Sequence, residues 1–252
     1  NGQSTVKSGE FAGLTLGELW REKPELFGSM KQQNFPLLIK ILDASSDLSV
    51  QVHPGDDYAY AHENGELGKT ECWYILDCDP NSEIVYGHNA NTKEELINMM
   101  NNEEWDRLLR REKIKPGDFF YVPAGTIHAL CKGALVLEIQ QSSDTTYRVY
   151  DYNRIDSDGN LRELHLDKAI DVIKVPHLSE KKLNQVLKLK GATLTKFIES
   201  KYFSVYKWDI SSTLSMKQKE KFQLVSVIEG GGHIQTTEGR FVINKGDHFI
   251  LP

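Results

Sequence analysis

Residues 117–128 have the sequence GDFFYVPAGTIH, which predicts two β-strands joined by a tight turn. The aromatic residues of the first half favour a strand. Pro-Ala-Gly then favours a turn, because proline fixes φ and glycine tolerates a left-handed backbone. His128 begins the following strand, so its imidazole is expected at a strand end beside a sharp turn.

Two upstream segments supply side chains that could join His128 in a metal site. In Gln51-Val52-His53 the outer residues are two positions apart, so in a strand they share one face with Cα atoms roughly 7 Å apart. Glu71 begins a further strand, predicted for residues 71–76. Imidazole nitrogens and a carboxylate oxygen are ligands that suit zinc. The combination is much rarer than a single packed histidine, and it predicts a zinc site.

Two further charged residues are candidates for the chemistry of this site. Lys69 precedes Glu71 by two residues and would point into the same pocket, unless it is a solvated lysine at the end of a loop. Glu138 lies in the apolar run of residues 135–140, where burial would raise its pKa and suit it to proton transfer. Its alternative role is that of a buried ion-pair partner of Arg148.

The composition limits the classes of partner. The chain has 252 residues, of which 39% are hydrophobic and 26% charged, and its formal net charge is −6. Such a chain can form a large core in one or two domains. A net acidic protein is a poor general binder of nucleic acid or anionic membranes, and no apolar run is long enough for a membrane span. We therefore expect neither partner, and a phosphorylated substrate would need a local cluster of lysine and arginine.

The cysteines and the N-terminal residues indicate the cellular compartment of the protein. Three cysteines at uninformative spacing, and the lack of a signal-like apolar segment near Asn1, predict a protein of a reducing compartment, the cytoplasm. Cys131 follows His128 by three residues, but no second cysteine or histidine pair supports it as a ligand. We expect Cys131 in the core.

Apolar periodicity and turn residues predict the order of the elements. Thr15 followed by Glu18 predicts a capped helix. Residues 54–68 are expected to be a loop, and residues 155–189 a polar connector with a short helix at 166–173. Helices are also predicted at 92–100 and 103–111, and strands at 36–42, 48–53, 71–76, 84–87, between 119 and 148, and from 192 onward.

Four stretches of the chain resemble type I mannose-6-phosphate isomerases in their short bacterial form, which are zinc enzymes of the cupin superfamily. The resemblance runs from about Leu16 to Asp151 and continues more weakly to the end; the four stretches are residues 48–54, 68–74, 123–129 and 138–151. It implies a mainly β double cupin of two jelly-roll barrels. It also implies interconversion of mannose 6-phosphate and fructose 6-phosphate by proton transfer through an enediol or enediolate.

The resemblance assigns roles to individual residues. Four residues match the zinc ligands of the family: Gln51, His53, Glu71 and His128. Gln51 is the weakest of them, because an amide oxygen binds zinc poorly. Arg148 matches a catalytic arginine, whose charge does not titrate and suits a phosphate or an enediolate; the alternative is an ion pair with Asp144 or Asp151. Glu138 matches a carboxylate that lines the pocket.

An internal repeat indicates two cupin-like parts. Residues 115–123 align with residues 244–252, since both contain Gly-Asp and a proline five residues after that aspartate. We expect a catalytic cupin domain at 1–190, with a helical insertion at about 88–113, and a second cupin-like domain at 191–252. The chain stops before an equivalent of the Gly-x2-His pattern, so the second barrel is expected to be incomplete.

Two other functions compete with the isomerase. A non-catalytic metal-binding or sugar-binding cupin would not need charged side chains beside an open metal. An iron-dependent cupin oxygenase gives no role to Lys69 or to residues 142–148.

We expect a sugar phosphate as substrate and a monomer or weak homo-oligomer. The general base stays open, and Lys69 and Arg154 are candidates besides Arg148 for binding the phosphate.

Overall fold

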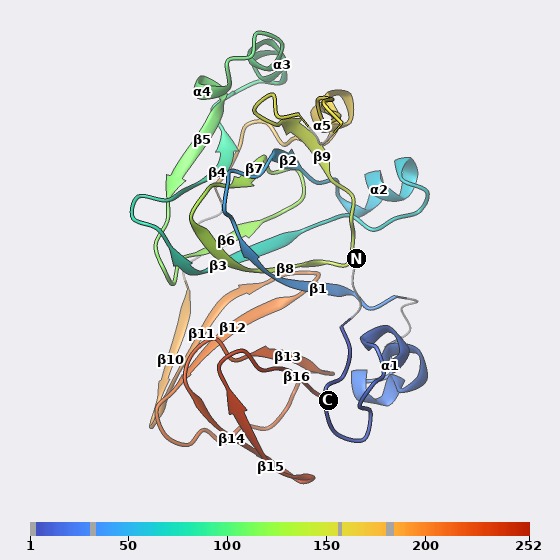
Figure 1. Cartoon of the computed structure of the whole chain (residues 1–252), viewed down its shortest axis with the longest axis vertical. Coiled ribbons are helices and arrows are strands. Elements are labelled where there is room, and N and C mark those ends of the chain that lie inside the picture. The colour runs from blue at the N-terminus through green and yellow to red at the C-terminus, as the bar shows by residue number, and fades with distance from the viewer. Residues whose placement is uncertain (1–3, 31–33, 156–157, 180–183) are drawn as a thin grey trace. The chain divides into compact units, whose positions relative to one another are not determined.

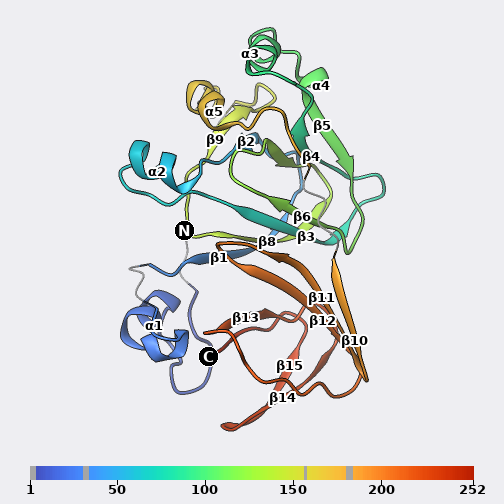
Figure 2. The ribbon, with the colours of Figure 1, turned by 180° about the vertical axis from the view of Figure 1, so that it is seen from behind.

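The structure is a computed structural model, and it describes four ranges of the chain: 4–30, 34–155, 158–179 and 184–252. The chain forms two units, of which unit 1 comprises residues 1–36 and 215–252 and unit 2 comprises residues 37–214. Antiparallel strands dominate both, as predicted (Figures 1 and 2). Within the described ranges, no helix is both long and apolar enough to cross a membrane. The predicted domain boundary at residue 190 stays a prediction.

Two antiparallel sheets form most of unit 2. The strand order is β1-β8-β3-β6 in the first sheet and β5-β4-β7-β2-β9 in the second. The first contains β1 (Leu37–Asp43), β3 (Glu71–Cys78), β6 (Phe119–Val122) and β8 (Ala134–Gln141). The second contains β2 (Val50–Val52), β4 (Glu83–His88), β5 (Leu109–Lys113), β7 (His128–Leu130) and β9 (Tyr147–Tyr150).

The two sheets face each other across a hydrophobic core. Trp73 and Ile75 of β3 belong to one buried cluster with Ile84 of β4 and Leu130 of β7. This arrangement is sheet-on-sheet packing, in which alternate side chains of each strand point inward. The sheets stay separate in the described part of the chain, so the closed jelly-roll barrels that the resemblance implied are not formed.

Three helices contribute to the core on the other face of the second sheet: α3 (Lys93–Asn101), α4 (Trp105–Leu108) and α5 (Leu166–Val172). Leu96 and Met99 of α3 lie in one buried cluster with Val50 and Val52 of β2. The apolar stripe predicted for residues 92–100 is therefore core. Because Val50 and Val52 point to this cluster, Gln51 between them points to the opposite face, toward the first sheet.

One predicted loop was wrong. Residues 54–68 contain a helix, α2 (Asp56–His62), which follows Gly55 and has two aspartates in its first turn. Acidic side chains are favourable at that end of a helix. Only Ala59 of this helix is buried, so no apolar stripe marked it in the sequence. The Asp56 carboxylate accepts the N–H of Gly68 at 3.1 Å, which closes the loop that follows.

Two other segments also differ from the prediction. The helix predicted at 103–111 is short, because α4 ends at Leu108 and the next residues form β5, which pairs with β4. Strand pairing here outweighs the local helical pattern. The connector predicted at 155–189 contains α5, as expected, but it also contains β10 (Gln185–Leu189). Every residue of β10 is exposed. It pairs with β11 (Ala192–Glu199), which pairs with β12 (Ser204–Ile210).

Unit 1 has an aromatic core. Its helix α1 (Leu16–Glu22) begins with the predicted cap, in which the Thr15 hydroxyl accepts the Glu18 N–H at 3.2 Å. The rings of Trp20, Phe27 and Phe222 pack edge to face with centroids 5.1–6.4 Å apart. The other elements of the unit are η1 (Pro24–Phe27), β13 (Gln223–Ser226), β14 (Gly231–Thr236), β15 (Gly239–Asn244) and β16 (His248–Leu251).

The internal repeat is present in the backbone as well as in the sequence. In both copies the aspartate accepts the backbone N–H three residues before it, at 3.0 Å for Asp118 and 2.7 Å for Asp247. The preceding glycine is left-handed in both, with φ of 91° at Gly117 and 90° at Gly246. A strand follows each turn, β6 in unit 2 and β16 in unit 1.

Candidate metal centre

Three residues that the sequence nominated as metal ligands meet in unit 2. His53 follows β2, Glu71 begins β3 and His128 begins β7. Each is at most 1% exposed, and one ligand atom from each lies within 4.8 Å of the others. In the part of the chain that the structure describes, no other group of three or more histidine, cysteine, aspartate or glutamate side chains is arranged to hold a metal ion.

Backbone carbonyls orient both imidazole rings. His53 Nδ1 lies 2.9 Å from the carbonyl oxygen of Thr145, and His128 Nδ1 lies 2.9 Å from that of Thr126. A carbonyl oxygen only accepts hydrogen bonds, so each Nδ1 carries the proton and each Nε2 carries a lone pair. Such outer partners fix the tautomer and the direction of metal-binding histidines.

The inner atoms of the cluster lack hydrogen-bond partners. His53 Nε2 lies 3.4 Å from Oε2 of Glu71, and His128 Nε2 lies 3.3 Å from Oε1. All four atoms are buried, and none of them has a hydrogen-bond partner among the described residues. Facing lone pairs repel, and burial of polar atoms without partners is unfavourable. A divalent cation between these atoms removes both penalties, so the donor set fits a metal.

The protonation states also suit a metal. Burial and the neighbouring Lys69 ammonium lower the pKa of His53 to about 3, and burial lowers the pKa of His128. Burial alone would raise the pKa of Glu71, but its histidine and lysine neighbours outweigh that effect and lower it. At neutral pH the cluster therefore presents neutral imidazoles and a carboxylate, the forms that bind metal ions.

The Pro-Ala-Gly turn connects the two histidines. Gly125 has φ of +87°, and a Cβ at this position would lie 2.7 Å from the carbonyl oxygen of Val172. Its N–H donates to the carbonyl of His53 at 2.9 Å. A residue with a side chain is strained in this backbone and clashes with Val172, so the turn that precedes His128 depends on glycine.

Lys69 is a buried neighbour of Glu71. Its side chain is 7% exposed, and Nζ lies 3.4 Å from Glu71 Oε2. It is thus not the solvated lysine of the alternative interpretation. The chain before it passes close to α2, because a Cβ on Gly68 would lie 2.4 Å from the backbone nitrogen of Asp56. The following N–H, of Thr70, donates to Gln141 Oε1 at 2.8 Å, which fixes the backbone between Lys69 and Glu71.

Gln51 shares a sheet face with two other predicted site residues. In β2 it pairs opposite His128 of β7 on one side and opposite Arg148 of β9 on the other. Residues directly opposite one another in antiparallel strands project from the same face. Gln51 is half-buried there, and its ligation of a metal stays a prediction.

Glu138 pairs with a residue that the sequence analysis missed. Its Oε2 lies 3.1 Å from Lys40 Nζ of β1, and its Oε1 accepts the Trp73 indole N–H at 3.2 Å. The structure therefore gives it Lys40 as ion-pair partner, and not the Arg148 of the alternative interpretation. Burial, followed by the Glu71 charge, raises the pKa of Glu138 against the opposing effect of the lysines. Lys40 could have been noticed as a lone charge in the apolar stretch LLIKIL.

Arg148 projects from β9 and contacts the segment before α5. Its Nη1 donates to the carbonyl of Glu163 at 2.6 Å, and its Nε is buried without a hydrogen-bond partner among the residues that the structure describes. The Asp151 carboxylate, an alternative partner, instead accepts hydrogen bonds from Arg154 and Arg162. The guanidinium of Arg154 is occupied by this carboxylate and by the Asp47 carbonyl, which argues against Arg154 as the phosphate ligand.

Cys131 and two histidines of unit 1 lie outside the cluster. Cys131 is a buried core residue, as predicted, and its sulfur accepts a weak contact from Arg111 Nη1 at 3.6 Å. His233 and His248 lie in β14 and β16 of unit 1, and His248 Nδ1 is 2.9 Å from the Ser226 hydroxyl.

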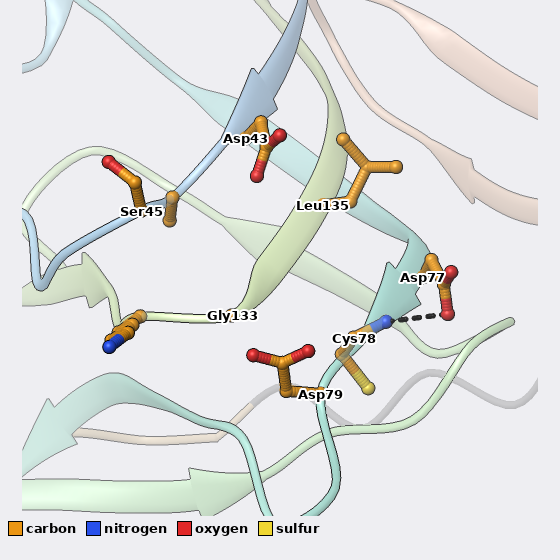
Figure 3. A pocket seen from close by; sticks show the side chains of 9 residues that line it. Asp43, Ser45, Asp77, Cys78, Asp79, Gly133 and Leu135 are labelled. Atoms are coloured by element: carbon orange, nitrogen blue, oxygen red, sulfur yellow. Dashed lines mark hydrogen bonds between the residues drawn. The ribbon is translucent and has the colours of Figure 1, made fainter.

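An acidic pocket of about 310 Å³ in unit 2 contains none of the predicted site residues (Figure 3). Asp43, Asp77 and Asp79 line it with Lys132. Asp77 uses one carboxylate oxygen to accept the N–H of Cys78 at 2.9 Å. These aspartates do not converge as a metal-binding group, so the pocket has no part in the candidate centre.

Comparisons with known proteins agree on one family. Residues 1–76 match the family model for the catalytic domain of type I phosphomannose isomerase, and residues 193–252 match that for the cupin domain of mannose-6-phosphate isomerase. The chain is 58% identical over 252 residues to mannose-6-phosphate isomerase ManA of Bacillus subtilis (strain 168), covering all of this chain and 80% of that protein. It is 51% identical over 255 residues to the mannose-6-phosphate isomerase of Streptococcus mutans serotype c, with 100% and 79% coverage.

Solved structures match as well. The crystal structure of the mannose 6-phosphate isomerase from Bacillus subtilis superposes with a TM-score of 0.95 at 55% identity, over 99% of this chain and 80% of that one. A phosphomannose isomerase from Salmonella typhimurium gives a TM-score of 0.70 at 16% identity, over 96% and 81% of the chains. The second likeness concerns the fold alone, and together the two confirm the predicted cupin fold class.

Proposed function

The chain belongs to the type I phosphomannose isomerase family, and on this premise we propose that it holds one zinc ion at His53, Glu71 and His128. Its activity is that of a mannose-6-phosphate isomerase, which interconverts mannose 6-phosphate and fructose 6-phosphate. Gln51 is proposed as an additional ligand, because it shares the sheet face of His128.

The observation that carries the metal proposal is the set of four buried ligand atoms on the three residues that make no hydrogen bond within the described ranges. Zinc is favoured by the nitrogen and oxygen donors and by the small number of protein ligands, which leaves a position for substrate. When bound, the metal supplies a Lewis acid that stabilises negative charge on the substrate oxygens.

Three charged side chains complete the proposed site. Lys69 supplies a fixed positive charge beside Glu71. Glu138 is the candidate for moving the proton between the substrate carbons, and its raised pKa and its hydrogen bond from Trp73 support that role. Arg148 binds the phosphate or stabilises the enediolate, since its buried Nε–H makes no hydrogen bond to the described part of the chain and can donate to an anionic ligand.

We also propose a cellular location, a class of partner and an oligomeric state. We place the enzyme in the cytoplasm, which is supported by three cysteines that are all free thiols. The net charge of −6 disfavours nucleic acid and an anionic membrane surface as partners, and the isomerase family supports a small sugar phosphate. The proposed oligomeric state is a monomer or weak homo-oligomer.

A coupled isomerase assay on metal-depleted protein tests the proposed function. We expect activity on mannose 6-phosphate to disappear on chelation and to return with added zinc. His53→Ala should stay inactive with added zinc, whereas the control His248→Ala should behave like the wild type. Full activity of the chelated protein, or of His53→Ala, would contradict the proposal.

A further inference from the structure

The backbone of Arg148 is bound by a histidine that no pattern in the sequence singled out. Its strand, β9, is the last strand of the order β5-β4-β7-β2-β9 and so has one open edge. At that edge the Arg148 N–H donates to His165 Nδ1 at 3.1 Å, and the His165 N–H donates to the Arg148 carbonyl at 2.8 Å. A single residue therefore satisfies both backbone groups of Arg148.

These bonds determine how Arg148 faces its neighbour in the sheet. Because its N–H and C=O both point to His165, the opposite residue Gln51 is its partner in a non-hydrogen-bonded antiparallel pair. Side chains are closest in pairs of this kind. The geometry at His165 thus brings the Arg148 side chain toward Gln51, and Gln51 lies opposite His128 in turn.

The same short segment also directs the guanidinium. Arg148 Nη1 donates to the carbonyl of Glu163 at 2.6 Å, two residues before His165. The Arg148 Nε is buried and has no protein partner in the described structure. One end of the guanidinium is therefore fixed by the protein, and an N–H remains for an anionic group.

The segment is itself anchored to the end of β9. Arg162 donates to the Asp151 carboxylate through Nε at 2.6 Å and also through Nη2. Asp151 is 3% exposed, so this ion pair has a partly desolvated member. A turn with left-handed residues at Tyr152 and Asn153 follows Asp151 and reverses the chain direction.

We propose that His165 is a positioning residue for Arg148. It does not contact substrate; it accepts the Arg148 N–H through Nδ1 and thereby sets the direction of the guanidinium in the site. This inference rests on the proposed function only through the role of Arg148. The hydrogen bond itself can be measured whatever the substrate is.

The test compares two replacements of His165. His165→Leu removes the acceptor, whereas His165→Asn keeps an oxygen near the position of Nδ1 and is also acceptable before a helix. His165 makes no side-chain cap to α5, so neither variant removes a helix cap. Leu164→Ala, a truncation of an exposed neighbour, is the matched control.

We expect kcat/KM of His165→Leu to fall by about 10- to 100-fold, the effect of a small displacement of a catalytic group. His165→Asn should recover most of it, and Leu164→Ala should match the wild type. In an Arg148→Ala background His165→Leu should cost less than about twofold, because the two residues act as one unit. An equal loss in both backgrounds, or a loss in Leu164→Ala as large as in His165→Leu, would overturn the proposal.

Hydrogen exchange of the Arg148 amide separates this proposal from the isomerase function. Protection should be lost in His165→Leu and kept in His165→Asn, at unchanged metal content. Unchanged protection in His165→Leu overturns the positioning role. A wild-type protein without isomerase activity would instead count against the proposed function, and the exchange result would still decide the role of His165.

Discussion

The inner atoms of His53, Glu71 and His128 lack the hydrogen bonds that a satisfied buried residue such as Gln140 makes. Gln140, which is also fully buried, donates to the carbonyls of Gln141 and Ser143 at 2.9 Å each. That is the usual state of a buried amide. In the cluster the outer nitrogens are satisfied in the same way, but the inner atoms face each other. A cation is the simplest partner that satisfies them together.

The proposed role of the Arg148 side chain can be tested by substitution. Arg148→Ala should lower kcat by about 10²–10³, as for removal of one preorganised electrostatic group. Arg148→Lys should recover part of the loss, because lysine lacks the planar fork. Zinc content and melting temperature should stay close to the wild type, all measured on the same preparation. A near-normal kcat with a lowered melting temperature would remove Arg148 from the catalytic residues.

Among the elements, those with a strong local signal could be predicted from the sequence. The turn before His128 follows from its proline and glycine, and the capped start of α1 from Thr15 and Glu18. α2 and β5 could not be predicted in this way. α2 is a short exposed helix without an apolar stripe, and β5 is a strand because it pairs with β4. The ion pair of Lys40 with Glu138 could not be predicted, because Glu138 lies 98 residues away in the sequence and is brought next to Lys40 only by strand pairing.

The Gly125 turn can be tested by comparing two alanine substitutions. Gly159 also has a positive φ, of 83°, but no atom of a described residue lies within 4 Å of a Cβ there, so Gly159→Ala should cost about 1 kcal/mol of unfolding free energy from backbone strain alone. Gly125→Ala adds the clash with Val172 and should cost about 2–4 kcal/mol. Urea unfolding measures both. Equal costs would contradict the close packing at Gly125.

The ion pairs of Asp151 predict a pH dependence of stability. Burial raises the pKa of Asp151, but hydrogen bonds from Arg162 and Arg154 outweigh it and hold the pKa below its usual 3.8. A depressed pKa means that the carboxylate stabilises the fold above that usual value and that this contribution is lost as the pH falls through the folded pKa. The stability difference between the wild type and Asp151→Asn should therefore be constant from pH 7 to 5 and shrink below about pH 4. A difference that shrinks already between pH 7 and 5 would contradict this assignment.

For the whole molecule, metal binding and folding are thermodynamically linked. An ion that binds the folded chain and not the unfolded chain stabilises it, by about 4 kcal/mol at a free concentration 1,000 times the dissociation constant. Chelation should therefore lower the melting temperature, and added zinc should restore it. Glu71→Gln, which removes the central carboxylate, should melt at the same temperature with and without chelator. A wild-type protein that is insensitive to chelation would argue against a resident metal.

His53, Glu71 and His128, which the sequence nominated together, also lie together in the structure, whereas the closed barrel expected around them is not formed. The ligand types and the two-residue spacing at Gln51 and His53 were sufficient to nominate the centre. The separate sheets depend on contacts between distant parts of the chain. Such contacts leave no local pattern in the sequence.

Elemental analysis decides whether His53, Glu71 and His128 hold a zinc ion. Purified wild-type protein should contain one zinc ion per chain, and His128→Ala should contain little or none while keeping its fold by circular dichroism. His233→Ala, a histidine of unit 1, is the control and should keep its zinc. Full zinc occupancy in His128→Ala would contradict the account.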